Sequence, residues 1–295
     1  MSTSLPPREN PTDPPPLEPH TAPPVALVTP DPWEALRPYT PARIALGRSG
    51  SSLPTAAVLA FGSAQAQARD AVHAPLEGAL LAQQLQAQGL THLRVHSAAP
   101  DRTHYLRRPD LGRRLDAASR AKLQEQARGV PAPACVFVLA DGLSAPAVAH
   151  HGVAVLACLR ALWRAQAGPD PRSGDIWRTP IVIAEQARVA LGDEIGELLG
   201  AQQLVMLIGE RPGLSAPHSL GLYLTQAPRT GCTDAQRNCL SNVRPEGLDY
   251  PQAAWRLAGL LAGARALGRS GVDLKDEAAG LLPAIAWPAT PQPLA

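Results

Sequence analysis

The sequence predicts an α/β protein in which a mainly helical N-terminal region precedes a mostly parallel sheet. Three short apolar runs that contain β-branched residues are typical of strands buried on both faces. These runs are residues 135–140, 180–184 and 204–208. Longer segments with helical composition separate them. Strands that alternate with helices at these lengths indicate parallel βαβ units with right-handed crossovers.

The composition is that of an ordinary globular protein. A length of 295 residues suggests two domains, and 45% hydrophobic against 18% charged residues allows a substantial core. The formal net charge of +2 gives no argument for nucleic acid or a membrane surface as the partner, and no uninterrupted apolar span is long enough to cross a membrane. The four cysteines lack CxxC spacing, which argues against a metal pair or disulfide framework and fits a reducing cytosol.

The first 31 residues form a proline-rich head that we predict to be disordered, because prolines at this density block helices and sheet ladders. Order is expected to begin at Asp31, which is suited to cap a short helix with Pro32 at its first position. Residues 32–129 are expected to form a mainly helical domain, and residues 130–295 a second domain that ends in a proline-rich tail. The Gly- and Ser-rich residues 40–54 resemble a phosphate loop but lack its spacing, so a structural loop is favoured.

The helical N-terminal region contains one expected strand and one basic stretch. The composition predicts helices at residues 54–69, 75–89 and 119–128, and the alternation of His92–His96 predicts a short strand. The basic side chains are Arg107, Arg108, Arg113 and Arg114. Such a stretch either grips an anion or acidic partner or is the solvated end of a helix. No interleaved aromatic residues support nucleic acid.

After residue 140 the pattern predicts a long helix from Ser144 to about Ala167 and an acid-started helix at residues 193–200. A further strand at residues 220–225 and a closing helix from Tyr250 to Leu267 follow. Loops at the carboxyl ends of parallel strands form the usual ligand crevice of such sheets. Here those loops are residues 141–144, 185–189 and 209–213, so one site is expected where they converge.

The common catalytic motifs are missing from these loops. The GxGxxG spacing of nucleotide folds and the GxSxG elbow of hydrolases are absent. Asp141, Ser144 and His150 or His151 contain the residue types of a hydrolase triad, but Ser144 begins a helix, where capping is its default role. Glu210 and Arg211 follow the strand at residues 204–208, and this charged pair fits a ligand edge and a surface salt bridge about equally well.

Six ordered motifs resemble the small (light) subunit of ethanolamine ammonia-lyase. The resemblance runs from about residue 32 to about residue 272, outside the head and the tail. The motifs are Arg43–Arg48, Tyr105–Arg114, Ala140–Ser144, Arg188–Ala201, Ile208–Leu214 and Asn238–Asn242.

This resemblance implies a Rossmann-like second domain that closes over adenosylcobalamin at the interface with a large catalytic subunit. The family's enzyme converts ethanolamine into acetaldehyde and ammonia by a radical route. The family's cobalamin contacts correspond here to Val189, Glu210 and Cys239, with Leu240 in place of the family's usual isoleucine. No catalytic residue and no protein metal ligand are expected in this chain. For Val189 and Cys239, the residues alone favour plain core packing.

The resemblance also implies a hexamer of large–small pairs in the cytoplasm, in this family often inside bacterial microcompartments. Neither nucleic acid nor a membrane is expected as a partner. Two other interpretations stay open from the sequence. One is a stand-alone nucleotide-binding oxidoreductase on a Rossmann-like fold, which fold analogy permits. The other is a purely structural subunit that never contacts the cofactor.

Overall fold

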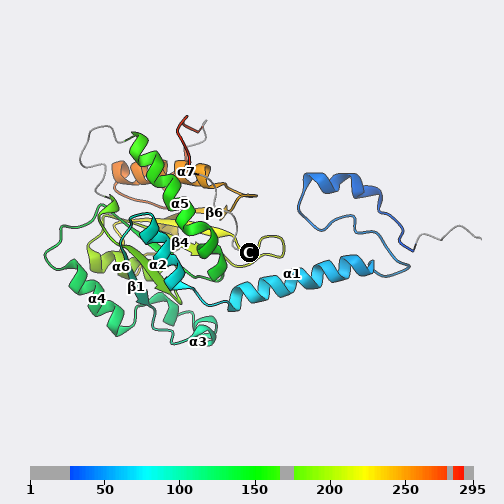
Figure 1. Ribbon diagram of the computed structural model, residues 1–295, viewed down its shortest axis with the longest axis horizontal. Helices are drawn as coiled ribbons and strands as arrows, with labels where there is room; N and C mark the ends of the chain where they lie inside the picture. Colours follow the sequence, from blue (N-terminus) through cyan, green and yellow to red (C-terminus); the bar gives the residue numbers. More distant parts are fainter. Residues whose placement is uncertain (1–26, 167–175, 278–281, 289–295) are drawn as a thin grey trace, which may run out of the picture. The chain divides into compact units, whose positions relative to one another are not determined.

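The computed structural model describes residues 27–166, 176–277 and 282–288 (Figure 1). Most of the proline-rich head and most of the proline-rich tail lie outside these ranges, so the expected disorder of the head stays a prediction. The chain divides into two compact units, Met1–Leu59 and Ala60–Ala295. Each unit is described here by itself.

The first unit contains a short 3₁₀ helix, η1 (Pro32–Tyr39). The carboxylate of Asp31 accepts a hydrogen bond of 2.9 Å from the backbone N–H of Trp33, which confirms the predicted cap. Thr29 and Arg48 exchange two backbone hydrogen bonds of 2.7 and 2.9 Å. They join the segment before η1 to the segment after it, which fits the structural loop expected at residues 40–54. Among residues 27–59 only Pro54 is buried, so the described part of this unit has no hydrophobic core of its own.

Helix α1 (Thr55–His73) begins in the first unit and ends in the second. The other α-helices are α2 (Gly78–Ala87), α3 (Arg102–Arg107), α4 (Ala117–Ala127), α5 (Ala145–Gln166), α6 (Leu191–Leu199) and α7 (Tyr250–Leu267). The strands are β1 (His92–His96), β2 (Cys135–Ala140), β3 (Ile181–Glu185), β4 (Gln203–Gly209), β5 (Leu220–Gln226) and β6 (Arg237–Val243). Short 3₁₀ turns lie at Leu111–Arg113 and Asp234–Gln236.

All six strands belong to one sheet in the order β1-β3-β2-β4-β5-β6. Strands β1, β3, β2 and β4 are parallel, whereas β5 and β6 are antiparallel to their neighbours. The predicted α/β class with a mostly parallel sheet is therefore confirmed. Strand β1 comes from the region expected to be helical and pairs with β3, so the sheet extends across the expected boundary at residue 130.

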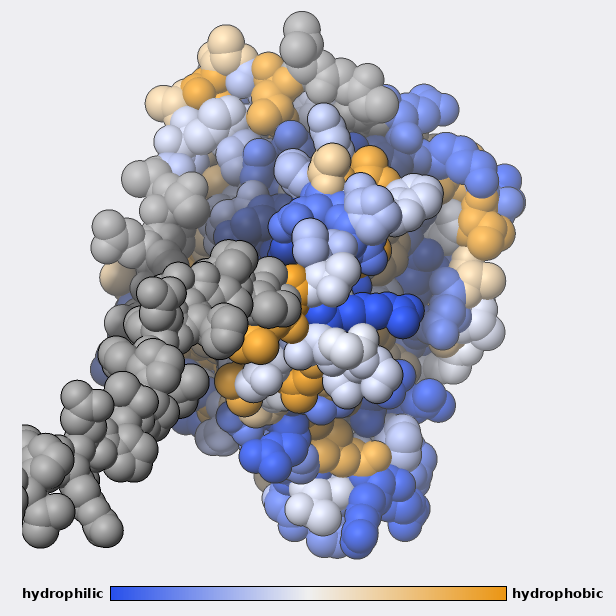
Figure 2. Space-filling view, turned by 90° about the vertical axis from the view of Figure 1, so that its right-hand side faces the viewer, coloured by the Kyte–Doolittle hydropathy of each residue, from blue (hydrophilic) through white to orange (hydrophobic). Residues whose placement is uncertain are grey.

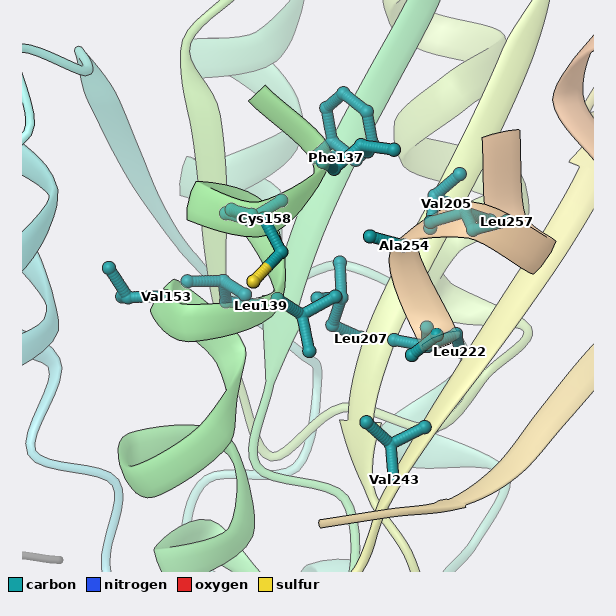
Figure 3. Close-up of a cluster of buried hydrophobic side chains, with 14 of the residues drawn as sticks. Phe137, Leu139, Val153, Cys158, Val205, Leu207, Leu222, Val243, Ala254 and Leu257 are labelled. Atoms are coloured by element: carbon teal, nitrogen blue, oxygen red, sulfur yellow. The ribbon is translucent and has the colours of Figure 1, made fainter. Parts of the chain in front are cut away.

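Helices cover both faces of the sheet. Helices α2, α5 and α7 pack on one face, and α4 and α6 pack on the other (Figure 1). In Figure 3, Phe137, Leu139 and Val205 of the sheet meet Cys158 of α5 and Leu257 of α7. Helix α5 is long and apolar enough to cross a membrane, but 61% of its most apolar window is buried in this core, so packing explains its composition.

The strand order places a topological switch at the carboxyl ends of β2 and β4, because β3 and β4 lie on opposite sides of β2. At this point the loops that follow β2 and β4 pack against each other and fill the crevice where a ligand would bind in such a sheet. The backbone N–H of Leu143 donates to Gly209 O at 3.0 Å. A Cβ added to Gly142 or to Gly209 would overlap backbone atoms of the opposite loop, so both positions require glycine.

Candidate functional site

The carboxylate of Asp141 joins the loops that follow β2 and β3. Its Oδ1 accepts from the backbone N–H groups of Gly142 and Ala187 at 2.9 Å each, and its Oδ2 accepts from Gln186 N–H at 2.8 Å. Arg102 lies 3.3 Å from Oδ2. Burial raises the pKa of Asp141 to about 6, against the opposing effects of Arg102 and the three N–H donors. Asp141 is therefore a structural connector of the two loops.

This arrangement disfavours the nucleotide-binding alternative. In nucleotide-binding sheets, backbone N–H groups of the first strand–helix turn hold the phosphates. Here the loop N–H groups already donate to the carboxylate of Asp141. The backbones of Gly142 and Gly209 also lie so close together that they leave no space for a phosphate between β2 and β4. The hydrolase interpretation is also unsupported, because Ser144 Oγ donates to Pro217 O at 2.9 Å and His151 pairs with the Tyr250 hydroxyl at 2.8 Å.

Val189 lies between β3 and the start of α6. It is partly buried and packs against the hydrophobic cluster on the α4 and α6 face of the sheet. The preceding Arg188 is engaged elsewhere, since its guanidinium lies 4.2 Å from the centre of the Tyr105 ring and donates to Tyr105 O at 3.2 Å. The backbone of Arg188 also donates to Gly112 O at 2.8 Å. Both residues of the Arg-Val pair are partly exposed, and Arg188 is the one held by Tyr105 and Gly112.

Glu210 follows β4 and is held by β6. Its Oε1 accepts from the hydroxyl of Ser241 at 2.5 Å, and its Oε2 accepts from the backbone N–H of Asn242 at 3.1 Å. Its own N–H donates to Ser219 O at 3.0 Å, which fixes the start of the loop. These hydrogen bonds run to β6 rather than to the neighbouring Arg211, so the salt-bridge interpretation gains no support.

Cys239 lies on β6 directly across from Tyr223 of β5. Cys239 is exposed as a residue, but its sulfur is partly covered and hydrogen-bonds the Tyr223 hydroxyl. Partial burial and the nearby Glu210 raise the pKa of the thiol, and the hydrogen bond from Tyr223 opposes them. Burial and Cys239 likewise raise the pKa of Tyr223. Both groups keep their protons at neutral pH, so Cys239 is not set up as a nucleophile.

Strand register brings these side chains onto one face of the sheet. Gly221 lies opposite Ile208, and Tyr223 lies opposite both Met206 and Cys239. Tyr223 packs against the same hydrophobic cluster as Val189. The structure therefore places Glu210 and Cys239 together around Tyr223, and Val189 on the same face.

Gly221 allows two of these side chains to lie close to the backbone of β5. A Cβ at this position would lie 3.2 Å from Cγ of Glu210 and 3.1 Å from the ring of Tyr223. Both contacts are tight, so any larger residue would displace the Glu210 carboxylate. Sequence reasoning missed Gly221, Tyr223 and Ser241. The only available signal was the two-residue period of the last two strands.

A buried ion pair fixes α6, and with it Val189, against β6. Arg237 of β6 bonds Asp193 of α6, and the two side chains are 3% and 2% exposed. Arg237 also donates to Cys232 O at 2.9 Å. Burial raises the pKa of Asp193 to about 6, and the attraction of Arg237 opposes this shift. The next residue of α6, Glu194, likewise pairs with an arginine, Arg120 of α4, and so joins α6 to α4.

Within the described ranges, no group of three or more His, Cys, Asp or Glu residues is arranged to hold a metal ion. The adjacent His150 and His151 have ring centres 5.9 Å apart, and His218 lies 5.4 Å from His150. Burial lowers the pKa of all three histidines. They line a separate pocket of about 550 Å³ on the α5 and α7 side of the sheet.

Comparison with known proteins adds an independent line of evidence. Residues 30–275 match the family described as ethanolamine ammonia-lyase light chain (EutC). The chain is 55% identical over 255 residues to the ethanolamine ammonia-lyase small subunit of Ralstonia nicotianae, covering 86% of this chain and 91% of the relative. It is 55% identical over 250 residues to the small subunit of Pseudomonas fluorescens, covering 84% and 88%. It is also 55% identical over 252 residues to that of Azotobacter vinelandii, covering 85% and 90%. The chain therefore belongs to the ethanolamine ammonia-lyase light chain family.

Proposed function

We propose that this chain holds adenosylcobalamin at its interface with the large catalytic subunit of ethanolamine ammonia-lyase. Its family and its relatives make it a component of an ammonia-lyase complex. The observation that carries the cofactor proposal is the single sheet face formed by Glu210, Tyr223 and Cys239. Val189 borders the same face.

The chemistry of this face fits the rim of a cobalamin. Cobalamin presents amide groups around an apolar ring system, so its site needs hydrogen-bond acceptors and apolar contacts. An ionised carboxylate has about four acceptor positions, and Glu210 uses two of them on β6. The remaining positions suit amide N–H donors. Val189 and the neutral thiol of Cys239 supply apolar contact, and Gly221 allows Glu210 and Tyr223 to lie close to the backbone of β5.

When bound, adenosylcobalamin supplies the radical chemistry that converts ethanolamine into acetaldehyde and ammonia. The side chains of this chain bind and orient the cofactor. Neither Cys239 nor Tyr223 is suited to transfer a proton, because both have raised pKa values. We therefore place the substrate and all catalytic residues on the large subunit.

The same proposal includes the finer features implied by the family. Strands β3 and β4 lie on opposite sides of β2, and the crossover helices α5 and α6 cover opposite faces of the sheet, which supports a Rossmann-like arrangement. A hexamer of large–small pairs is proposed, with the complex in the cytoplasm and packaging in a microcompartment as an additional possibility to test. Size measurement of the purified complex and fractionation of the cells test these points.

A binding experiment with three samples tests the function. Adenosylcobalamin is titrated into the large subunit alone, into this chain alone and into the reconstituted complex, and the fraction bound is measured after rapid filtration. Tight binding is expected in the complex alone. Equal affinity for the large subunit alone would make this chain a purely structural partner. Binding of NAD(P) by this chain alone, measured by fluorescence, would instead support the oxidoreductase alternative.

A further inference from the structure

We infer that residues 27–59, here called the N-terminal arm, are a docking segment for the large subunit. Eight large apolar side chains of the arm are exposed: Leu27, Val28, Trp33, Leu36, Tyr39, Leu53, Val58 and Leu59. Trp33 is 64% exposed, Tyr39 85% and Leu59 68%. Figure 2 shows hydrophobic residues lying uncovered between hydrophilic ones on the face toward the viewer. Clusters of exposed apolar side chains usually mark an interaction site.

The arm has a defined backbone although it lacks a core. Asp31 caps η1, and Thr29 and Arg48 hold each other through two backbone hydrogen bonds. Ser49 and Ser52 close a turn through backbone hydrogen bonds of 2.9 and 3.1 Å. A segment that is already ordered by local hydrogen bonds loses less conformational entropy when it binds, and this favours tight docking.

The residue types identify the kind of partner. Trp and Tyr are enriched in the cores of protein–protein interfaces, where they act as anchors, and charged residues are depleted there. The arm has two carboxylates and three arginines in 33 residues, and Glu34 lies 3.7 Å from Arg37. This near-neutral, aromatic-bearing surface fits an apolar protein groove. It lacks the basic excess that nucleic acid or an anionic membrane would need.

The family match identifies the large subunit as the occupant. The match begins at residue 30, so almost the whole arm belongs to the family, whereas residues 1–29 do not. Relatives whose alignments cover 84–86% of this chain are named small subunits, which makes a large subunit the partner against which the exposed side chains of the arm would pack. This inference rests on the proposed assembly with that subunit. The arm contains none of Val189, Glu210 and Cys239, so it extends the interface beyond the cofactor face.

Paired variants of the full-length chain test the inference. Leu59→Gln and the double variant Trp33→Ser/Tyr39→Ser remove arm anchors. Val272→Gln is the matched control, because Val272 is 67% exposed and lies outside the arm. Affinity for the immobilised large subunit is measured by interferometry. Both arm variants are expected to bind at least about tenfold more weakly, and the control within about twofold of the wild type.

The outcomes separate the inference from the proposed function. If the wild-type chain does not bind the large subunit, the assembly itself is wrong. If the wild type binds and the arm variants bind as tightly as Val272→Gln, only the arm inference is wrong. At saturating large subunit, the arm variants should bind adenosylcobalamin normally, because the cofactor residues are intact.

Deuterium exchange of the wild-type chain supplies a second measurement. Amides of residues 27–59 that lie outside the local hydrogen bonds should be unprotected in the free chain and become protected when the large subunit is added. Protection in the free, dilute chain would mean that the rest of this chain covers the arm. Protection that appears only as the free chain is concentrated would mean that a second copy covers it. Either result overturns the inference.

Discussion

Replacing Arg237 by methionine removes one partner of the buried ion pair that joins β6 to α6. Methionine keeps most of the side-chain volume, so the main change is an uncompensated carboxylate at Asp193, which is only 2% exposed. Breaking a buried pair in this way costs about 3–5 kcal/mol. This is a large share of the roughly 5–15 kcal/mol that stabilises a typical domain.

The penalty depends on pH because it comes from the charged form of Asp193. Burial raises its folded-state pKa from 3.8 to about 6 even with Arg237 in place. A carboxyl with a raised folded pKa binds its proton more tightly when folded, so stability falls as pH rises through this window. Removing Arg237 raises the pKa further. The loss of stability should therefore be greater at pH 8 than at pH 5.

Urea denaturation followed by far-UV circular dichroism measures the effect at both pH values. Arg269→Met is the control, because Arg269 and Asp273 form an exposed pair 3.3 Å apart with side chains 62% and 53% exposed. Such a pair contributes about 0–1 kcal/mol. The double variant Arg237→Met/Asp193→Leu should recover much of the stability, since the buried charge is gone. The reasoning is refuted if Arg237→Met unfolds at the same urea concentration as Arg269→Met at both pH values.

Three further predictions follow from the same structure. Gly221→Ala should weaken adenosylcobalamin binding about fivefold by displacing the Glu210 carboxylate. Gly62→Ala is the control and should leave binding unchanged, because a Cβ at Gly62 meets nothing within 4 Å. Equal affinities of the two variants would contradict the account. The raised pKa of Cys239 should make its alkylation by iodoacetamide at pH 7 slower than that of an ordinary exposed thiol, as measured by mass spectrometry, and bound cofactor should slow it further. The arginines at residues 107–114 should not bind random duplex DNA at physiological salt, because Asp110 already pairs with Arg108 at 2.8 Å; salt-sensitive binding in a gel-shift assay would refute this.

The sequence was sufficient to predict the parallel part of the sheet. The short apolar runs at β2, β3 and β4 are easy to recognise as strands, because strands buried on both faces contain almost no polar residues. The helices between them and the closing helix Tyr250–Leu267 were also predicted, with small differences at most ends. Strand β1 was recognised as a strand, but its pairing with β3 depends on contacts 89 residues apart in sequence.

The face that carries the candidate site was harder to predict. Strand β6 buries only Arg237, Leu240 and Val243, so its hydrophobic period is weak. Its antiparallel pairing with β5, which places Cys239 beside Tyr223, is set by register rather than by local composition. The sequence therefore indicated Glu210 at a strand end but not the hydrogen bonds that orient its carboxylate.

Asp141 is a second residue whose role could not be predicted from the sequence. A carboxylate directly after a buried strand suggested a ligand-binding or catalytic residue. In the fold it accepts three backbone hydrogen bonds and joins two loops. Its role depends on N–H groups of residues 186 and 187, which no local pattern places near it.

The central claim is that Glu210 binds adenosylcobalamin, and the Glu210→Gln variant tests it most directly. The variant is assembled with the large subunit and titrated with the cofactor, with Glu125→Gln on the exposed side of α4 as the control. A hydrogen bond to a charged group is worth about 1.5–3 kcal/mol, so affinity should fall about ten- to a hundredfold. Turnover at saturating cofactor should change much less, because we propose that the catalytic residues lie on the large subunit. An intact Glu210→Gln complex that binds adenosylcobalamin as tightly as the Glu125→Gln control would contradict the claim.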